Sequence, residues 1–208
     1  MLDANPEGTL FCFAPGIYRP VNQAGYNPKA SQRLIGAGLG VILSGAKILA
    51  GPWTVSGSQW WASAFLPGAA NGGGACKVGT LCTERQDVFR DGVRLVRVAT
   101  AGAATAGKFF TDYAANRVYV GDDPNGHLIE QAWANRIVAS ANSGIVVKNF
   151  TIQMAANDVQ SGAVEPLGTA GGWTIAYNDV HDNHGGGVGM GDPAAGNGST
   201  FAHNRIHH

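Results

Sequence analysis

Five side chains in the C-terminal third of the chain have the chemistry of a general acid or base. They are Asp158, Glu165, Asp182, His184 and Asp192. Two carboxylates that face one sugar can act as acid and base in glycoside hydrolysis, and their separation decides the stereochemical outcome. His184 or a carboxylate could instead remove a proton beside a uronate carboxylate, as a polysaccharide lyase requires. Asp, Asn and His also stabilise tight turns, and for each residue taken alone this structural explanation is favoured.

These side chains depend for their position on a short strand that contains Val164 and on a similar one that contains Val188. If both valines point inward, alternation along the strand points Glu165 outward. The other four candidates then lie in turns at the two edges of the strand. The predicted catalytic surface is therefore the outer face of this strand together with its flanking turns.

Aromatic and cationic side chains are predicted to hold the substrate. Trp60 and Trp61, with Trp53 nearby, offer large rigid faces on which sugar rings can stack. Packing of these indoles within the protein is an equally good explanation of their presence. Arg205 could pair with the carboxylate of a uronate sugar.

A sequence repeat indicates which elements carry these residues. Residues 174–181 match residues 200–207 at a shift of 26, and residues 147–152 match residues 175–180 at a shift of 28. Repeats of this length, rich in glycine, favour three short strands separated by tight corners over pairs of helices. Stacked coils of this kind form a parallel β-helix, in which each coil covers the apolar core of its neighbour.

The repeat also predicts the residues that stack inside the coils. Ile175 is expected next to Val147 on one side and Phe201 on the other, and Val180 next to Ile206. Like residues would then lie one strand spacing apart along the column.

At the corners and on the outside, the same register places polar residues in pairs. Asn178 and Asn204 are expected at equivalent corners, because Asn tolerates the left-handed conformation and its amide can hydrogen-bond along the column. Asp179 is expected beside Arg205 on the outer surface, where an ion pair contributes at most about 1 kcal/mol.

Histidines gather near the end of the chain. They are His181, His184, His203, His207 and His208. Imidazole binds Zn²⁺ and Ni²⁺ well, and the repeat brings His181 near His207, so a metal site is one hypothesis. No H-E-x-x-H motif occurs and the spacing fits no standard site, which favours a surface ladder. We therefore expect no metal site and no cofactor.

The composition excludes several classes of protein. The 208 residues include 31 glycines and only 13% charged residues, and the 14 basic and 14 acidic residues cancel. A nucleic-acid-binding protein would show a basic patch or stripe. The hydrophobic fraction of 45% is too high for a disordered chain, and no run of 18 apolar residues occurs. Neither nucleic acid nor a membrane is expected as a partner.

The regular pattern is interrupted in the first half of the chain. Short strands are predicted near residues 10–13, 33–36 and 41–45, and a β-hairpin over 110–120. We predict a single β-helix domain over residues 1–208, incomplete at its C-terminus, from which residues 56–126 leave as an insertion.

The ends and the cysteines lead to two further expectations. The chain starts without the pattern of a signal peptide and stops within a strand-like pattern, so a piece of a longer protein is expected. Cys76 and Cys82 bracket a glycine-containing loop and could form a disulfide in an oxidising compartment, or remain free thiols. Cys12 alternates with Phe11 and Phe13 and is expected to be a small buried residue.

Three stretches of the sequence resemble bacterial secreted right-handed parallel β-helix proteins of the pectate-lyase-like superfamily. They are Phe11–Arg19, Leu43–Lys47, and Gly107–Tyr113 with Asn116–Pro124. The resemblance spans nearly the whole chain and implies an all-β, right-handed parallel β-helix and a secreted full-length protein. Members include polysaccharide lyases, glycoside hydrolases, epimerases and non-catalytic surface proteins. Some of the lyases hold Ca²⁺ through Asp residues, but this chain shows no loop motif for it.

The sequence therefore predicts a carbohydrate-active β-helix protein, a monomer, that acts on an extended polysaccharide as a lyase or a hydrolase. The alternative is a non-catalytic β-helix that binds glycans or serves as a surface scaffold. An enzyme should bring two or more of the acidic and histidine candidates to one sugar. A scaffold would scatter them or occupy them in hydrogen bonds within turns.

Overall fold

The computed structural model describes residues 2–66, 79–189 and 198–207. The chain forms two compact units: Met1–Gly45 with Ala134–His208 is the first, and Ala46–Trp133 is the second. The expected insertion, residues 56–126, falls within the second unit. Within the described ranges, helix is limited to three single 3₁₀ turns, η1 (Leu2–Ala4), η2 (Leu81–Thr83) and η3 (Ala101–Ala103).

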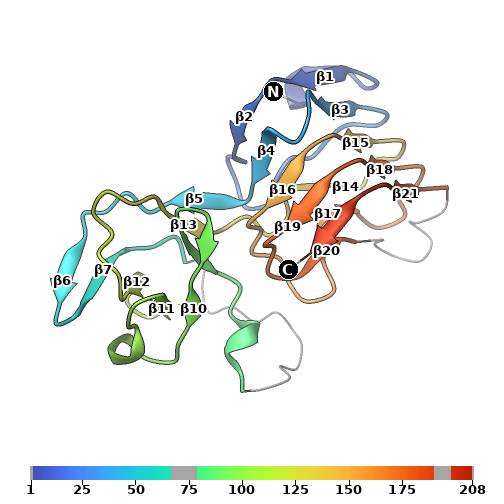
Figure 1. The fold of residues 1–208 in the computed structure, drawn as a ribbon. Coiled ribbons are helices and arrows are strands. Elements are labelled where there is room, and N and C mark those ends of the chain that lie inside the picture. Colours follow the sequence, from blue (N-terminus) through green and yellow to red (C-terminus); the bar gives the residue numbers. More distant parts are fainter. Residues whose placement is uncertain (1, 67–78, 190–197, 208) are drawn as a thin grey trace. The chain divides into compact units, whose positions relative to one another are not determined.

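The first unit is a β-solenoid of stacked parallel strands, as the sequence predicts (Figure 1). One sheet consists of β1 (Leu10–Phe13), β3 (Arg33–Gly36), β15 (Val146–Lys148), β18 (Thr174–Ala176) and β21 (Thr200–Ala202). A second consists of β2 (Gly16–Tyr18), β4 (Val41–Ser44), β16 (Thr151–Gln153), β19 (Asp179–His181) and β22 (Arg205–His207). The third consists of β14 (Val138–Ser140), β17 (Gly162–Pro166) and β20 (Gly186–Val188).

The strands that precede the second unit in the sequence pair directly with the strands that follow it, so the solenoid has no gap there. In Figure 1, β3 in blue lies directly beside β15 in yellow. Leu34 of β3 is in register with Val147 of β15, and Leu43 of β4 with Ile152 of β16. The chain thus leaves the column after two coils and returns at the position of the third.

The predicted register inside the solenoid is confirmed. Val147 pairs with Ile175, Ile175 with Phe201, and Val180 with Ile206. Val147, Ile175 and Val180 are fully buried in one hydrophobic core. Each coil supplies the same apolar positions, so the core repeats along the column.

At the corners of Tyr177 and His203, a left-handed residue is followed by an asparagine. The asparagine ladder is confirmed: Asn178 donates to Asn204 Oδ1 at 3.0 Å, and Asn178 Oδ1 accepts the Phe150 N–H at 3.1 Å. The expectation that these asparagines adopt the left-handed conformation is wrong. The preceding residues do so instead, with φ of 59° at Tyr177 and 55° at His203.

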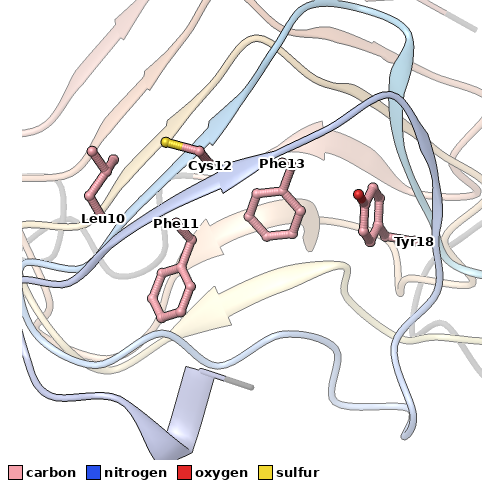
Figure 2. A pocket seen from close by; sticks show the side chains of 5 residues that line it. All are labelled: Leu10, Phe11, Cys12, Phe13 and Tyr18. Atoms are coloured by element: carbon pink, nitrogen blue, oxygen red, sulfur yellow. The ribbon is translucent and has the colours of Figure 1, made fainter.

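The first coil shows how alternation separates inside from outside. Figure 2 shows Phe11 and Phe13 on one side of β1, and Leu10 and Cys12 on the other. The ring of Phe13 packs edge-on against Tyr18, with centroids 5.1 Å apart. These five residues line a cavity of about 290 Å³. Cys12 is an exposed free thiol, so the expectation that it is buried is wrong.

The second unit is built from two mainly antiparallel sheets. One consists of β5 (Ala46–Ile48), β13 (Ile129–Ala132), β8 (Val88–Arg90) and β9 (Val93–Arg94). The other consists of β10 (Val96–Arg97), β11 (Lys108–Asp112), β12 (Arg117–Val120), β7 (Gln59–Ser63) and β6 (Thr54–Ser56). The hairpin of β11 and β12 confirms the one predicted over 110–120.

The second unit has a core of its own. Its buried members include Val88, Phe109, Val118 and Ile129, and the partly buried Trp60 packs against them. Cys82 is disulfide-bonded, and Cys76, its expected partner, lies outside the described residues. The described residues include no helix that is both long and apolar enough to span a bilayer.

Candidate functional site

Glu165, the central catalytic candidate, is buried in the third sheet of the solenoid. Only 4% of its surface is exposed. Arg136 Nε donates to Glu165 Oε1, and the Gly162 N–H donates to Oε2 at 2.8 Å. The backbone of Gly189 lies so close to this carboxylate that a Cβ there would collide with it. The geometry therefore gives Glu165 a position in a buried ion pair.

The remaining catalytic candidates are found in corners and turns. Asp182 has a left-handed φ of 53°, and its Oδ2 lies 2.8 Å from His181 Nδ1. Asp158 and His184 lie in turns of successive coils, where the His184 N–H donates to the Ala155 carbonyl at 3.0 Å. Asp192 lies outside the described residues.

One pair of these turns is tied together by a single side chain. Asn157 Nδ2 donates to the Ser161 and Gly186 carbonyls, and Asn157 Oδ1 accepts the Gly185 N–H at 3.0 Å. The backbone of Asp158 packs directly against Gly185. The structure thus brings the turns of Asp158 and His184 together, and Glu165 and Asp182 lie beside Arg136 and His181.

A different part of the first unit has the features of a ligand site. It lies where the first sheet turns into the second, at the corners between β18 and β19 and between β21 and β22. A cavity of about 240 Å³ opens there. Its lining residues are Leu39, Tyr177, Asn178, Asp179, His203 and Arg205.

Stacked rings form one side of this cavity. The Tyr177 and His203 rings lie face to face, with centroids 4.7 Å apart and an angle of 13° between their planes. The left-handed conformation at both positions aims the two side chains outward in parallel, one coil apart. Tyr177 is 52% exposed, so the stack presents an aromatic surface to solvent.

Opposite charges lie beside the stack. Asp179 Oδ1 accepts a hydrogen bond from His207 Nε2 at 3.0 Å, and Asp179 Oδ2 lies 3.9 Å from Arg205 Nη1. The Asp179 side chain is 19% exposed, whereas that of Arg205 is 75% exposed. The carboxylate is thus held in place, while the long ion pair leaves the guanidinium able to turn toward a ligand.

This combination suits a sugar. An aromatic face can stack on the apolar side of a pyranose ring, and the carboxylate and guanidinium can accept and donate hydrogen bonds to its hydroxyl groups. Among the described residues that line the cavity, Asp179 is the carboxylate. The geometry therefore supports binding of a sugar more directly than it supports two-carboxylate hydrolysis.

Of the predicted substrate-binding residues, the cavity contains Arg205. Trp60 and Trp61 belong to the second unit, where Trp60 packs against the core and Trp61 lies on the opposite face of β7. Sequence reasoning missed Tyr177 and His203 as site residues. Their signal was present in the repeat of 26 residues, which puts an aromatic or imidazole ring at the same corner twice.

Two of the histidines, His181 and His207, stack on the outside of the second sheet of the solenoid. The His181 and His207 rings stack with centroids 5.1 Å apart, as the repeat predicts. Each lies beside a carboxylate, Asp182 for His181 and Asp179 for His207. Over residues 2–66, 79–189 and 198–207, no group of three or more His, Cys, Asp or Glu is arranged to hold a metal ion.

No protein-family model and no curated protein matches this sequence. Two solved structures are similar. One is described as the complex of XylC with xylose: it has a TM-score of 0.65 and 16% identity, over 85% of this chain and 35% of that chain. The other is described as a glycoside hydrolase, with a TM-score of 0.48 and 10% identity, over 86% of this chain and 55% of that chain.

The shared property is the fold. At 16% identity, the similarity to XylC concerns the fold alone. It assigns no role to any residue of this chain. The chain spans about a third of the length of that protein and about half of the other.

Proposed function

We propose that this chain is part of a carbohydrate-active β-helix protein and that it binds an extended polysaccharide along the corner formed by Tyr177 and His203. The observation that carries the proposal is the stacked pair of rings beside Asp179 and Arg205 in one cavity. A stack alone is common in solenoids, but here it is joined by an acceptor and a donor that a sugar can use.

The repetition of the corner residues along the solenoid axis favours an extended, chain-like ligand. Tyr177 and His203 repeat at the spacing of the coils, and the equivalent corner of the preceding coil carries Asn149, also left-handed with φ of 63°. A polysaccharide that runs parallel to the solenoid axis would meet one outward side chain of this ladder on each coil. Successive sugars could then contact successive coils.

Cleavage of the polysaccharide, by lyase or hydrolase chemistry, is the finer part of the proposal. Asp179 is its main support, because this carboxylate faces the cavity and is hydrogen-bonded to an imidazole that can supply or accept a proton. A uronate bound at Arg205 would have its carboxylate neutralised by the guanidinium. If the protein does not cleave the polysaccharide, the same cavity serves a non-catalytic β-helix that binds glycans.

The proposal is tested by binding and cleavage assays on the full chain. Affinity electrophoresis through gels that contain polygalacturonate, soluble xylan or mixed-linkage β-glucan measures binding to each. Tyr177→Ala is expected to weaken binding about tenfold, as truncation of a central aromatic contact does. Ile17→Ala is the matched control, since Ile17 is an exposed apolar residue of the second sheet, three coils away from that of Tyr177.

Reducing ends and ultraviolet absorbance, followed together, separate the chemistries. A rise in both indicates elimination, because a lyase leaves a conjugated double bond, and reducing ends alone indicate hydrolysis. Binding without either signal identifies a glycan-binding β-helix. Absence of binding to all three polymers, or unchanged binding by Tyr177→Ala, contradicts the proposal.

A further inference from the structure

The second unit carries a row of aromatic side chains across three neighbouring strands. Phe110 of β11 is in register with Tyr119 of β12, and Tyr119 is in register with Trp61 of β7. The row continues to Thr54 on the edge strand β6. Cross-strand neighbours on one face of an antiparallel sheet lie close enough for their side chains to act together.

This row lies on the face of the sheet that does not form the core. On the other face, Phe109, Val118 and Ala62 are buried. An antiparallel sheet with one buried face ordinarily alternates to polar residues on the opposite face. Phe110, Tyr119 and Trp61 break this rule together and are all partly exposed. Apolar surface with a polar rim, here Thr54 and the exposed Ser63, is typical of a ligand-binding surface.

The geometry of the rings restricts the shape of the ligand. The Trp61 and Tyr119 centroids lie 6.5 Å apart with 43° between the ring planes, and those of Tyr119 and Phe110 lie 6.0 Å apart with 40°. A flat crystalline surface could not stack on rings that are tilted to this extent. A flexible or twisted chain can present a differently oriented sugar to each ring.

The charges near the row restrict the chemistry of the ligand. The guanidinium of Arg117 lies over the Trp61 ring at 3.8 Å, and Asp112 is the cross-strand partner position of Arg117. Two cations, Lys108 and Arg117, and one carboxylate, Asp112, therefore lie on this face, and their charges partly compensate. Single-stranded nucleic acid would need a positively charged groove beside the aromatic rings. A face with little net charge that offers both hydrogen-bond donors and acceptors suits an uncharged ligand rich in hydroxyl groups better than it suits a polyanion.

We propose that Trp61, Tyr119 and Phe110 form a second glycan-binding surface, which takes a single, soluble, uncharged polysaccharide chain. The rings provide stacking faces for neighbouring sugars, apart from the face of Trp61 that the Arg117 guanidinium covers. Arg117 and Asp112 belong to the neighbouring cross-strand row and provide a donor and an acceptor for hydroxyl groups along one side of the aromatic rings. This surface is independent of the cavity at Tyr177, because all its residues belong to the second unit.

The test uses the full chain in a Tyr177→Ala background, in which binding at the proposed cavity of the first unit is expected to be about tenfold weaker. Binding is measured by affinity electrophoresis with soluble xylan and mixed-linkage β-glucan as uncharged probes, and with polygalacturonate and single-stranded poly(dT) as charged ones. Trp61→Ala and Phe110→Ala are the variants, and Val93→Ala, at an exposed apolar residue of β9 in the other sheet of the second unit, is the matched control. Thermal melts confirm that each variant is folded.

Retention of uncharged-glycan binding in the Tyr177→Ala background, reduced about tenfold or more by Trp61→Ala or Phe110→Ala, supports the proposal. Should Trp61→Ala fail to fold, Phe110→Ala and Tyr119→Phe carry the test, and Tyr119→Phe is expected to bind nearly as the background does. Loss of all glycan binding in the background overturns this second surface while leaving the first cavity intact. Unchanged binding by both ring variants, or preferential binding of polygalacturonate or poly(dT), also overturns it.

Discussion

The two units of this protein position side chains in opposite ways. In the solenoid, the same residue position recurs on successive coils, so that each residue is supported by its counterpart. The Asn178 backbone N–H donates to Asn204 Oδ1 just as the Phe150 N–H donates to Asn178 Oδ1. The pattern of bonds is a property of the coil, and a functional surface built on it is repeated as well.

The second unit instead gathers unlike residues from distant parts of its segment. Arg97 donates to Glu84 Oε2 at 2.5 Å, to Thr111 Oγ1 at 2.9 Å and to the Gln86 carbonyl at 2.7 Å. Its guanidinium also lies over the Phe109 ring at 4.6 Å. No repeat relates these partners. The difference teaches that the first unit can be understood coil by coil, whereas the second depends on a few convergent contacts.

The largest loss of stability is expected for a tryptophan in the solenoid core, and Trp61 of the second unit provides the comparison. Trp173 is fully buried in the solenoid core, and its Nε1 donates to the Asn142 carbonyl at 2.8 Å. Trp173→Ala should lower the free energy of unfolding by about 3–5 kcal/mol. Trp61→Ala, on a partly exposed sheet face, should lower it far less and act on glycan binding instead. Denaturant melts of both variants check this, and equal losses of stability would remove the distinction between core and surface indoles.

The asparagine ladder gives the next largest effect. Asn178→Ala would leave the buried Phe150 N–H and Val147 carbonyl without their side-chain partner, at a cost of about 2–4 kcal/mol. Asn204→Ala removes the equivalent bonds at a less buried coil and should cost less. Chemical denaturation of the two variants side by side measures the difference. A larger loss of unfolding free energy for Asn204→Ala would mean that burial does not determine how much each asparagine stabilises the solenoid.

Two ion pairs of the solenoid provide a smaller contrast. Glu165→Ala leaves the Gly162 N–H unpaired and should reduce stability by about 1–3 kcal/mol. Arg205→Ala breaks an exposed ion pair and should change stability by less than about 1 kcal/mol. Thermal melts decide between them. A neutral Glu165→Ala that abolished cleavage would return Glu165 to the catalytic candidates.

A pH dependence is expected in the convergent cluster of the second unit, outside the neutral range. Burial raises the pKa of the Tyr113 hydroxyl from 10.0 to about 12, and this hydroxyl donates to Gln86 Oε1 at 2.6 Å. A raised pKa means that the folded state favours the neutral hydroxyl. The resulting stabilisation is present below about pH 10 and is lost as the pH rises toward about 12.

Melting temperatures of the wild type and Tyr113→Phe, taken from pH 9 to pH 12, test this dependence. The wild type should lose more stability over that interval than the variant. Parallel curves would show that Tyr113 ionises no later in the folded state than in the unfolded state.

The repeat made much of the solenoid predictable. The pairing of Ile175 with Phe201, of Asp179 with Arg205 and of His181 with His207 follows from one shift of 26 residues. The left-handed corner was misplaced by one residue. Asn is the usual occupant of that conformation, but the repeat also allows Tyr177 and His203, and the local turn decides between them.

The candidate site was less predictable, for physical reasons. Alternation places Glu165 opposite Val164, but it cannot show that Arg136 and the Gly189 backbone cover the carboxylate. The row of Trp61, Tyr119 and Phe110 depends on the order of strands in a sheet without repeats, and single-residue patterns do not reveal strand order. Tyr177 and His203 could have been identified, since the repeat already aligned them.

Hydrogen–deuterium exchange of the full chain shows whether glycans bind at the outward rings of both units. Exchange is compared with and without soluble xylan and mixed-linkage β-glucan. Slower exchange is expected at residues 176–179 and 202–205, and at 59–63 and 117–120, with little change along β14 and β17. Protection confined to the surroundings of Glu165, or no protection with either polymer, would contradict this expectation.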